Sequence, residues 1–201
     1  MEPITLSPPA GLRQWVQLYC LYRRSFPRSE RKPFRIILKK YRAGNTHIWC
    51  ILQTGKFLGF AATMNSPDLV MLDYLAISRK HRGRGIGTAA MTQLLARYRD
   101  RGFLLEIESP YEPGSDQALR QRRKQFYVNC GMEPLHIMAQ VFGVPMELLG
   151  KNCCLTFEDY RNFYRDFYRP QAARHILPSE LSRGIKKAPL RAKHSPENTL
   201  G

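Results

Sequence analysis

The spacing of apolar residues predicts two helices in the first 45 residues. A short apolar segment at 4–6 could form a strand, and Ser7-Pro8 after it is typical of a helix start. A helical repeat then follows, and we expect its shared apolar face to pack in the core. This face consists of Leu12, Trp15, Val16 and Tyr19. The second helix has an apolar face made of Phe34, Ile37, Leu38 and Tyr41, and Gly44 is its expected cap.

The next part of the chain has the pattern of an antiparallel meander. Residues 47–52 and 57–63 read as two strands around Thr54-Gly55, and residues 70–77 as a third. A helix with apolar residues from Ile86 to Tyr98 follows, and then a strand at 103–108. A strand–helix–strand unit normally makes a right-handed parallel crossover, so strands 70–77 and 103–108 are expected to lie parallel and adjacent.

Three further segments complete the pattern. We expect a helix over 117–130 and a strand over 135–142, with turn residues at Gly143-Val-Pro145. Behind Thr156, which begins a near capping box, lies a helix with four aromatic residues on one face. These are Tyr160, Phe163, Tyr164 and Phe167. We interpret this helix as docked on the sheet; a wall of a substrate pocket or a dimer contact is the alternative. The predicted domain is therefore 1–168, and 169–201, which is polar and without periodicity, is a disordered basic tail.

The most distinctive stretch is Arg82-Gly83-Arg84-Gly85-Ile86-Gly87, between the strand at 70–77 and the helix after it. Glycines at the start of a helix expose several backbone N–H groups together, and the helix dipole favours an anion there. The nucleoside-triphosphatase loop requires Gly-Lys-Ser/Thr, which is absent from the sequence, and the dinucleotide-binding fold requires a different glycine spacing. What remains is Arg-x-x-Gly-x-Gly, which resembles the acyl-CoA signature of the GNAT superfamily of N-acetyltransferases.

The resemblance covers roughly residues 1–150 and extends to Phe126-Tyr127 before Gly131. It implies an α/β fold with a GNAT-like mixed sheet, comprising an antiparallel N-terminal meander and a central splayed parallel pair, flanked by helices. Acetyl-CoA would be the co-substrate, with its pantetheine arm between the splayed strands. Backbone N–H groups would hold its pyrophosphate, and the N–H of Leu75 or Ile77 would polarise the thioester carbonyl. The expected pyrophosphate-binding residues are Arg82, Gly83, Arg84, Gly85, Ile86, Gly87 and Thr88.

Two glutamates are candidates for the general base. Glu106 and Glu108 alternate with apolar residues on one strand, so both carboxylates point to the same face. Burial raises a carboxylate pKa, and a raised carboxylate can accept a proton from an ammonium group and attract a cationic substrate. A solvent-exposed face, or pairing with Arg122 or Arg123, is the alternative. Asp73 lies on the strand before the loop and has the same parity as Leu75 and Ile77.

Tyr127 is the candidate proton donor. Acyl transfer from a thioester expels a thiolate, which a phenol of ordinary pKa near 10 can protonate with modest tuning. The family resemblance places this tyrosine beside the cofactor sulfur; a purely packing role is the alternative. The sequence departs from the family after the Glu106–Glu108 strand, where many members have Asn and this chain has Ser109-Pro110.

Composition bears on the binding partners, the cellular location and the metal content of the protein. The net charge of +16 attracts polyanions such as coenzyme A, nucleic acid or an anionic membrane surface. No apolar run approaches membrane-spanning length and the N-terminus lacks the features of a signal peptide, so a cytoplasmic protein is expected. The five cysteines have no metal-ligand spacing, so we expect free thiols and no metal site.

Taken together, these features predict transfer of an acetyl group from acetyl-CoA to a primary amine of a small molecule or peptide. The amine would attack directly in a ternary complex, and the paired glutamates favour a cationic acceptor. One alternative is a non-catalytic coenzyme A sensor. A less favoured one is a nucleic-acid binder that uses the basic run Arg120-Gln-Arg-Arg-Lys124 and the basic C-terminal tail. The sequence leaves open whether the protein forms a homodimer.

Overall fold

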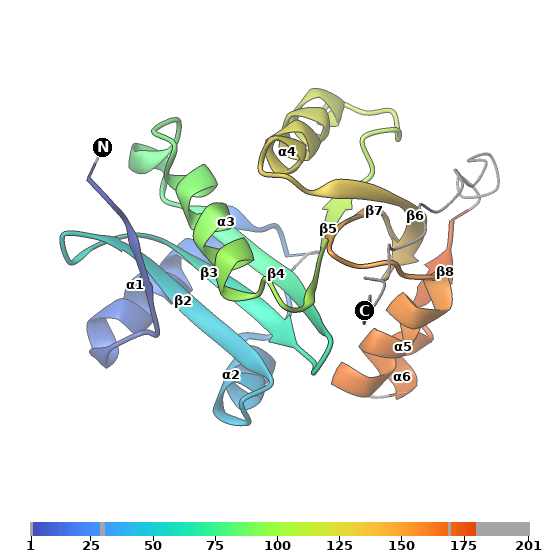
Figure 1. Ribbon diagram of the computed structural model, residues 1–201, viewed down its shortest axis with the longest axis horizontal. Helices are drawn as coiled ribbons and strands as arrows, with labels where there is room; N and C mark the ends of the chain where they lie inside the picture. Colours follow the sequence, from blue (N-terminus) through green and yellow to red (C-terminus); the bar gives the residue numbers. More distant parts are fainter. Residues whose placement is uncertain (1, 29–30, 169, 180–201) are drawn as a thin grey trace, which may run out of the picture.

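The computed structural model describes residues 2–28, 31–168 and 170–179. One sheet of eight strands runs through this part of the chain in the order β1-β2-β3-β4-β5-β7-β6-β8 (Figure 1). Every pairing is antiparallel except that of β4 with β5, as the strand–helix–strand pattern predicted. The strands are β1 Thr5–Ser7, β2 Thr46–Gln53, β3 Lys56–Asn65, β4 Leu69–Ile77, β5 Gly102–Glu108, β6 Glu133–Val141, β7 Val144–Lys151 and β8 Ile176–Pro178.

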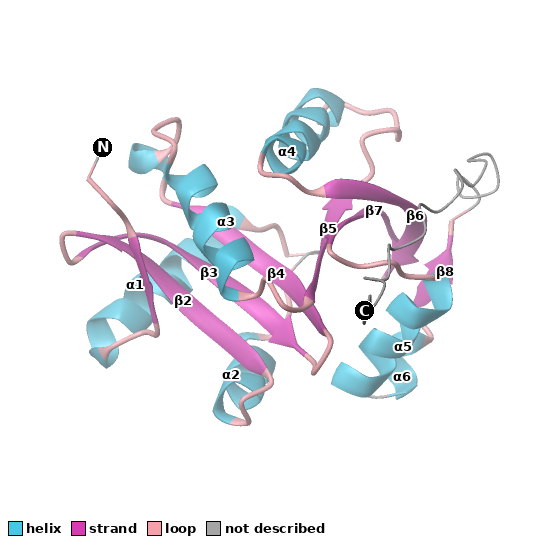
Figure 2. Ribbon diagram, viewed as in Figure 1, coloured by secondary structure: helices cyan, strands magenta, loops and turns pink. Residues whose placement is uncertain are grey.

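Helices cover both faces of this sheet (Figure 2). Side chains of α3 and α4 pack with Val70, Phe103 and Leu105 on one face. On the other face, α1 and α2 pack with Phe60 and other β2–β4 residues, while α5 packs over β4, β5 and β7. The helices are α1 Gly11–Ser25, α2 Phe34–Arg42, α3 Ile86–Arg97, α4 Gln117–Asn129, α5 Phe157–Phe167 and α6 Pro170–Ala173.

The first helix differs from the expectation in its start and in its buried face. It begins at Gly11, and Ser7 belongs to β1 instead of capping the helix. Leu12 is 80% exposed and Val16 is 52% exposed, so the predicted apolar stripe is not the core face. The residues of α1 that are buried are Leu18 and Tyr22, which lie on the neighbouring side of the helix.

Two strands were missed by the sequence pattern. The residues read as a turn, Gly143-Val-Pro145, include the start of β7, which inserts between β5 and β6. The predicted disorder from residue 169 onward is wrong for residues 170–178, which form α6 and β8. Ile176 of β8 is fully buried and pairs with Val141 of β6, so this segment belongs to the folded unit. The prediction for 180–201 falls outside the described residues.

Candidate functional site

The central feature of the site is the point where the two parallel strands separate. Register pairs join β4 to β5 from Leu69↔Gly102 to Leu72↔Leu105, and the ladder ends there. Both strands continue past this point, where β4 keeps its pairing with β3 and β5 keeps its pairing with β7. The predicted splay of the central pair is therefore confirmed, and it begins directly after Leu72 and Leu105.

A β-bulge coincides with this separation and changes the direction of Asp73. Thr63 of β3 pairs with Leu72 and Ala62 pairs with Tyr74, which leaves Asp73 as the extra residue. Bulges redirect side chains in this way. Strict alternation had placed Asp73 on the face of Leu75 and Ile77, but those residues pack beside α3. Asp73 instead points to the opposite face, where it meets Lys32.

The loop after β4 has the geometry expected of an anion site. Gly83 and Gly85 have φ values of 73° and 70°, which glycine adopts without strain. Gly85 is the N-cap of α3, and the helix has neither a side-chain cap nor an acidic residue in its first turn. The first N–H groups of α3 are thus not capped by a side chain, and they carry the positive end of the helix dipole. Nothing lies within 4 Å of a Cβ built on Gly83, so a bulky anion can approach the backbone there.

Arg82 has a partner within the chain. Its Nε donates a hydrogen bond to the carbonyl oxygen of Ile77 at 2.9 Å, which ties the loop to the end of β4. This bond leaves the two terminal nitrogens of the guanidinium for other partners. The roles predicted for the residues from Arg82 to Thr88, and for the N–H groups of Leu75 and Ile77, remain predictions.

On the opposite face of the sheet, two carboxylates follow the point of separation. Asp73 comes directly after Leu72 on β4, and Glu106 directly after Leu105 on β5. Lys32, from the segment between α1 and α2, places its Nζ 2.6 Å from Asp73 Oδ1. The side chains of Lys32 and Asp73 are only 21% and 10% exposed. A cation and two carboxylates are therefore gathered where the strands part.

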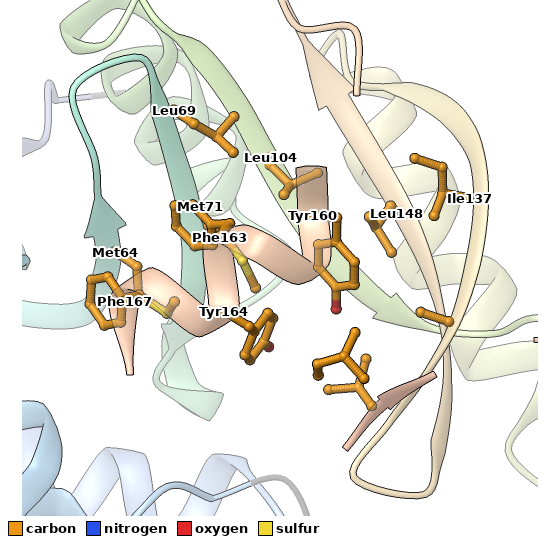
Figure 3. Close-up of a cluster of buried hydrophobic side chains, with 13 residues drawn as sticks. Met64, Leu69, Met71, Leu104, Ile137, Leu148, Tyr160, Phe163, Tyr164 and Phe167 are labelled. Carbon is orange, nitrogen blue, oxygen red and sulfur yellow. The ribbon is translucent and has the colours of Figure 1, made fainter. Parts of the chain in front are cut away.

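Glu106 is held by two tyrosines of the aromatic helix α5. The hydroxyl groups of Tyr160 and Tyr164 donate to Glu106 Oε1 at 2.6 and 2.7 Å. Both rings are almost completely buried, and Figure 3 shows them as neighbours on α5. Burial raises the pKa of Glu106, although Lys32 and the two hydroxyl bonds act in the opposite direction. Glu106 is therefore a stronger base than an exposed glutamate.

Aromatic rings surround the ammonium of Lys32. Its Nζ lies 5.0 Å from the ring centroid of Tyr168, 5.7 Å from that of Tyr164 and 6.0 Å from that of Tyr74. Cations are attracted to the faces of such rings. Burial opposes the charge of Lys32, but Asp73, Tyr168 and Glu106 outweigh it, so the Lys32 pKa is raised and the group stays protonated.

The second predicted glutamate has a different environment from the first. Glu108 Oε2 lies 3.7 Å from Arg123 Nη1 of α4, and its side chain is 26% exposed. Pairing with Arg123 was the alternative to a catalytic role, and at Glu108 this pairing is present. The structure thus separates two acids that the sequence could not distinguish.

Tyr127 lies on α4, where it packs with the cluster on the α3 side of the sheet. Its ring is 5.0 Å from that of Phe126, and Phe126 also lies beside Gly87 at the start of α3. Burial raises the pKa of Tyr127 to about 12. The phenol is therefore protonated at neutral pH, as a proton donor must be, but it is a weaker acid than a free tyrosine. Tyr127 and Glu106 lie on opposite faces of the sheet.

Comparison with known proteins identifies the family. A family model described as the acetyltransferase (GNAT) family matches residues 15–131, which is more than half of the chain. The chain belongs to the GNAT family of acetyltransferases. The comparison with curated proteins found no match.

Solved structures of GNAT proteins share the fold. A GNAT-family protein from Bacteroides thetaiotaomicron is 22% identical, with a TM-score of 0.63, and the match covers 79% of this chain and 92% of that one. An aminoglycoside 6'-N-acetyltransferase in complex with coenzyme A is 16% identical, with a TM-score of 0.58 and coverage of 74% and 95%. Naa50 of Arabidopsis thaliana, in complex with the bisubstrate analogue CoA-Ac-MVNAL, is 16% identical, with a TM-score of 0.57 and coverage of 75% and 99%.

Several polar residues of this GNAT protein were not recognised in the sequence. Lys32 is 41 residues from Asp73, and no local pattern links them. Tyr160, Tyr164 and Tyr168 recur at intervals of four, which is a signal that a single face of α5 carries their hydroxyl groups. Glu106, the hydrogen-bond partner of Tyr160 and Tyr164, could be found only from the fold.

A second buried ion pair was also missed. Lys124 Nζ lies 2.7 Å from Glu147 Oε1, and it also donates to the hydroxyl of Tyr111 at 2.7 Å. Glu147 belongs to β7, the strand that the pattern did not predict.

The described part of the chain has neither a metal-binding cluster nor a membrane-spanning helix. In residues 2–28, 31–168 and 170–179, no group of three or more His, Cys, Asp or Glu side chains is arranged to hold a metal ion. Within the same ranges, no helix has both the length and the apolar character to cross a membrane.

Proposed function

We propose that this GNAT protein transfers the acetyl group of acetyl-CoA to a primary amine by direct attack in a ternary complex. One observation carries the proposal. The central strands part at Leu72 and Leu105, an uncapped helix start with a glycine loop follows one strand, and a carboxylate follows the parting point on each strand. The loop suits the pyrophosphate of the co-substrate, and the carboxylates suit an ammonium group.

In this proposal Glu106 is the general base and Tyr127 is the general acid. Glu106 takes a proton from the acceptor ammonium, because burial raises its pKa and its two tyrosine donors fix its position. The free amine nitrogen then bonds to the acetyl carbonyl carbon, and the carbon–sulfur bond breaks. Tyr127 protonates the departing thiolate and is reprotonated from solvent. The nitrogen, positively charged after the attack, releases its second proton to solvent, which leaves a neutral amide and a thiol. The backbone N–H of Leu75 or Ile77 polarises the carbonyl.

The expected acceptor is a cationic primary amine of a small molecule, with a peptide amine as second choice. The excess of positive charge on the whole chain opposes a cation at long range. Screening confines that repulsion to roughly 8 Å at physiological salt, so the nearby acids dominate. The similar GNAT structures include one with a peptide-bearing bisubstrate analogue and an aminoglycoside 6'-N-acetyltransferase, which supports both kinds of acceptor.

The test is acetyl-CoA-dependent thiol release with a panel of cationic, neutral and acidic amines. Wild type should prefer cationic acceptors, and Glu106→Gln should lower kcat because it removes the base. Glu108→Gln is the matched control, since the same change two residues away removes only a contact with Arg123. Equal activity of wild type and Glu106→Gln toward every acceptor would contradict the proposed base. If acetyl-CoA bound without turnover of any amine, the protein would be a coenzyme A sensor.

A further inference from the structure

The surroundings of Lys32 form a compact cation site, which we call the ammonium cage. It consists of the carboxylate of Asp73 and the rings of Tyr74, Tyr164 and Tyr168, with the carboxylate of Glu106 held at its edge by the Tyr164 hydroxyl. Met64 adds a soft contact, with its sulfur 3.6 Å from Lys32 Nζ. Carboxylates combined with aromatic faces are the chemistry by which proteins recognise alkylammonium groups.

The cage is more elaborate than an ordinary ion pair requires. The second buried lysine pair, Lys124 with Glu147, is nearly as short, at 2.7 against 2.6 Å, and similarly buried, with side chains 20% and 4% exposed. Its lysine approaches a single ring, that of Tyr111 at 4.8 Å. The cage offers three rings and two acids. The acids, Asp73 and Glu106, are the first residues after the pairing of β4 with β5 ends.

The backbone of Lys32 is held by two hydrogen bonds, whereas its side chain is partly exposed. Tyr22 donates to the Lys32 carbonyl oxygen at 2.7 Å, and the Lys32 N–H donates to the hydroxyl of Tyr74 at 3.1 Å. The side chain is 21% exposed, so the cage borders solvent. Displacement of the ammonium from the cage requires rotation of its four-carbon stem and no break of these two backbone bonds.

We propose that the ammonium cage is the binding site for the ammonium group of the acceptor, and that Lys32 is an internal stand-in which the acceptor displaces. This inference rests on the proposed function and names its substrate class, an unbranched primary alkylammonium resembling a lysine side chain. Lys32 hydrogen-bonds to Asp73, whereas Glu106 accepts its bonds from two tyrosines. An acceptor nitrogen placed nearer Glu106 can lose its proton there, while Lys32 remains a protonated non-nucleophile.

The stand-in reduces the apparent affinity for acceptors. An acceptor can bind only when the Lys32 ammonium is outside the cage. If that state is populated about one tenth of the time, the apparent affinity for the acceptor falls about tenfold. Removing the competitor should therefore improve the use of a short alkylamine. A lysine that served only to position Asp73 and Glu106 would have the opposite effect, because its removal would lower activity.

The experiment compares wild type with Lys32→Ala, which empties the cage, and Lys32→Met, which keeps the volume of the stem without its charge. Lys124→Ala is the matched control on the other face of the sheet. Thermal melts with n-butylammonium chloride, and with n-butanol as the neutral probe, measure binding without acetyl-CoA. Melts with acetyl-CoA and formation of N-butylacetamide, followed by mass spectrometry, measure the transfer.

The proposal predicts that n-butylammonium raises the melting temperature of Lys32→Ala and that n-butanol does not. It also predicts that kcat/KM for n-butylamine increases in the order wild type, Lys32→Met, Lys32→Ala, with about tenfold between the extremes. Lys124→Ala should match wild type in its melting-temperature response to n-butylammonium and in its kcat/KM for n-butylamine. Should Lys32→Ala not fold, the comparison of Lys32→Met with wild type still decides.

Two results would overturn the proposal while the proposed function stands. One is that n-butylammonium stabilises Lys32→Ala no more than wild type, although acetyl-CoA stabilises both. The other is that both Lys32 variants acetylate amines more slowly than wild type, which would make Lys32 a positioning residue. Absence of stabilisation by acetyl-CoA in wild type would instead refute the proposed function, and the acceptor role of the cage with it.

Discussion

Replacing Tyr164 with phenylalanine tests whether Glu106 is the base. The change removes one hydroxyl group, which donates to Glu106 Oε1 at 2.7 Å, and keeps the ring that fills the core. A hydrogen bond to a charged group contributes about 1.5–3 kcal/mol, and each 1.36 kcal/mol is about a tenfold change in proton affinity. Tyr160 retains its own bond to the same oxygen at 2.6 Å, so we expect the lower end of this range.

The direction of the Glu106 pKa change follows from the protonation state of Glu106 that the lost hydroxyl group stabilises. The tyrosine hydroxyl stabilises the ionised carboxylate, so its loss raises the Glu106 pKa further. A base acts only when deprotonated, and the acidic limb of the kcat/KM profile should therefore move about one pH unit higher. The assay is thiol release at saturating acetyl-CoA and low amine concentration over a range of pH.

Tyr168→Phe is the control for this experiment. It is the same substitution one helical turn further on, but the Tyr168 hydroxyl donates to the sulfur of Met64 at 3.3 Å. Its acidic limb should stay close to that of wild type. If the limb of Tyr164→Phe also stayed in place, Glu106 would not be the group that titrates, and the proposed base would have to be abandoned.

Three further predictions concern the proton donor, the anion loop and the packing of β3 against β4. Tyr127→Phe should lower kcat but leave acetyl-CoA affinity unchanged, because it removes a proton donor and little volume; equal turnover across pH would make Tyr127 a packing residue. Gly85→Val should abolish the thermal shift caused by acetyl-CoA, while Gly143→Val, which also changes a glycine of positive φ, should retain it. Gly59→Ala should lower the free energy of unfolding by about 1–3 kcal/mol, measured by denaturant titration, because its Cβ would overlap the carbonyl oxygen of Ala76. Unchanged stability would show that β3 and β4 can separate there at little cost.

The order of elements and the parallel central pair could be predicted because they depend on local signals. Apolar periodicity and the glycine loop are read within a few residues, and a strand–helix–strand unit has one preferred handedness. The strand β7 could not be read in the same way. Its first residues include Pro145 next to a glycine turn, and Glu147 interrupts its apolar run while being buried against Lys124.

The candidate site could be predicted only on its loop side. Gly85 and its neighbours form a continuous motif, whereas the cage depends on contacts between residues far apart in the sequence. The bulge at Asp73 is a one-residue change of register against β3, which alternation of apolar and polar residues does not reveal. Glu106 could be named as a candidate, but its difference from Glu108 depends on Tyr160, Tyr164 and Arg123, which other elements supply.

The position of α5 has a consequence for how such a protein could diversify. The segment matched by the family model ends at residue 131, so it includes the anion loop, Tyr127 and both candidate acids, but not α5. The tyrosines that cover Glu106 come from this later helix, which packs over the sheet from outside the matched segment. Exchange of α5 alone could therefore retune acceptor choice while the acetyl-donor half keeps its sequence. In a chimera, α5 would change the surroundings of Glu106, while Glu106 itself and the anion loop would stay with the matched segment.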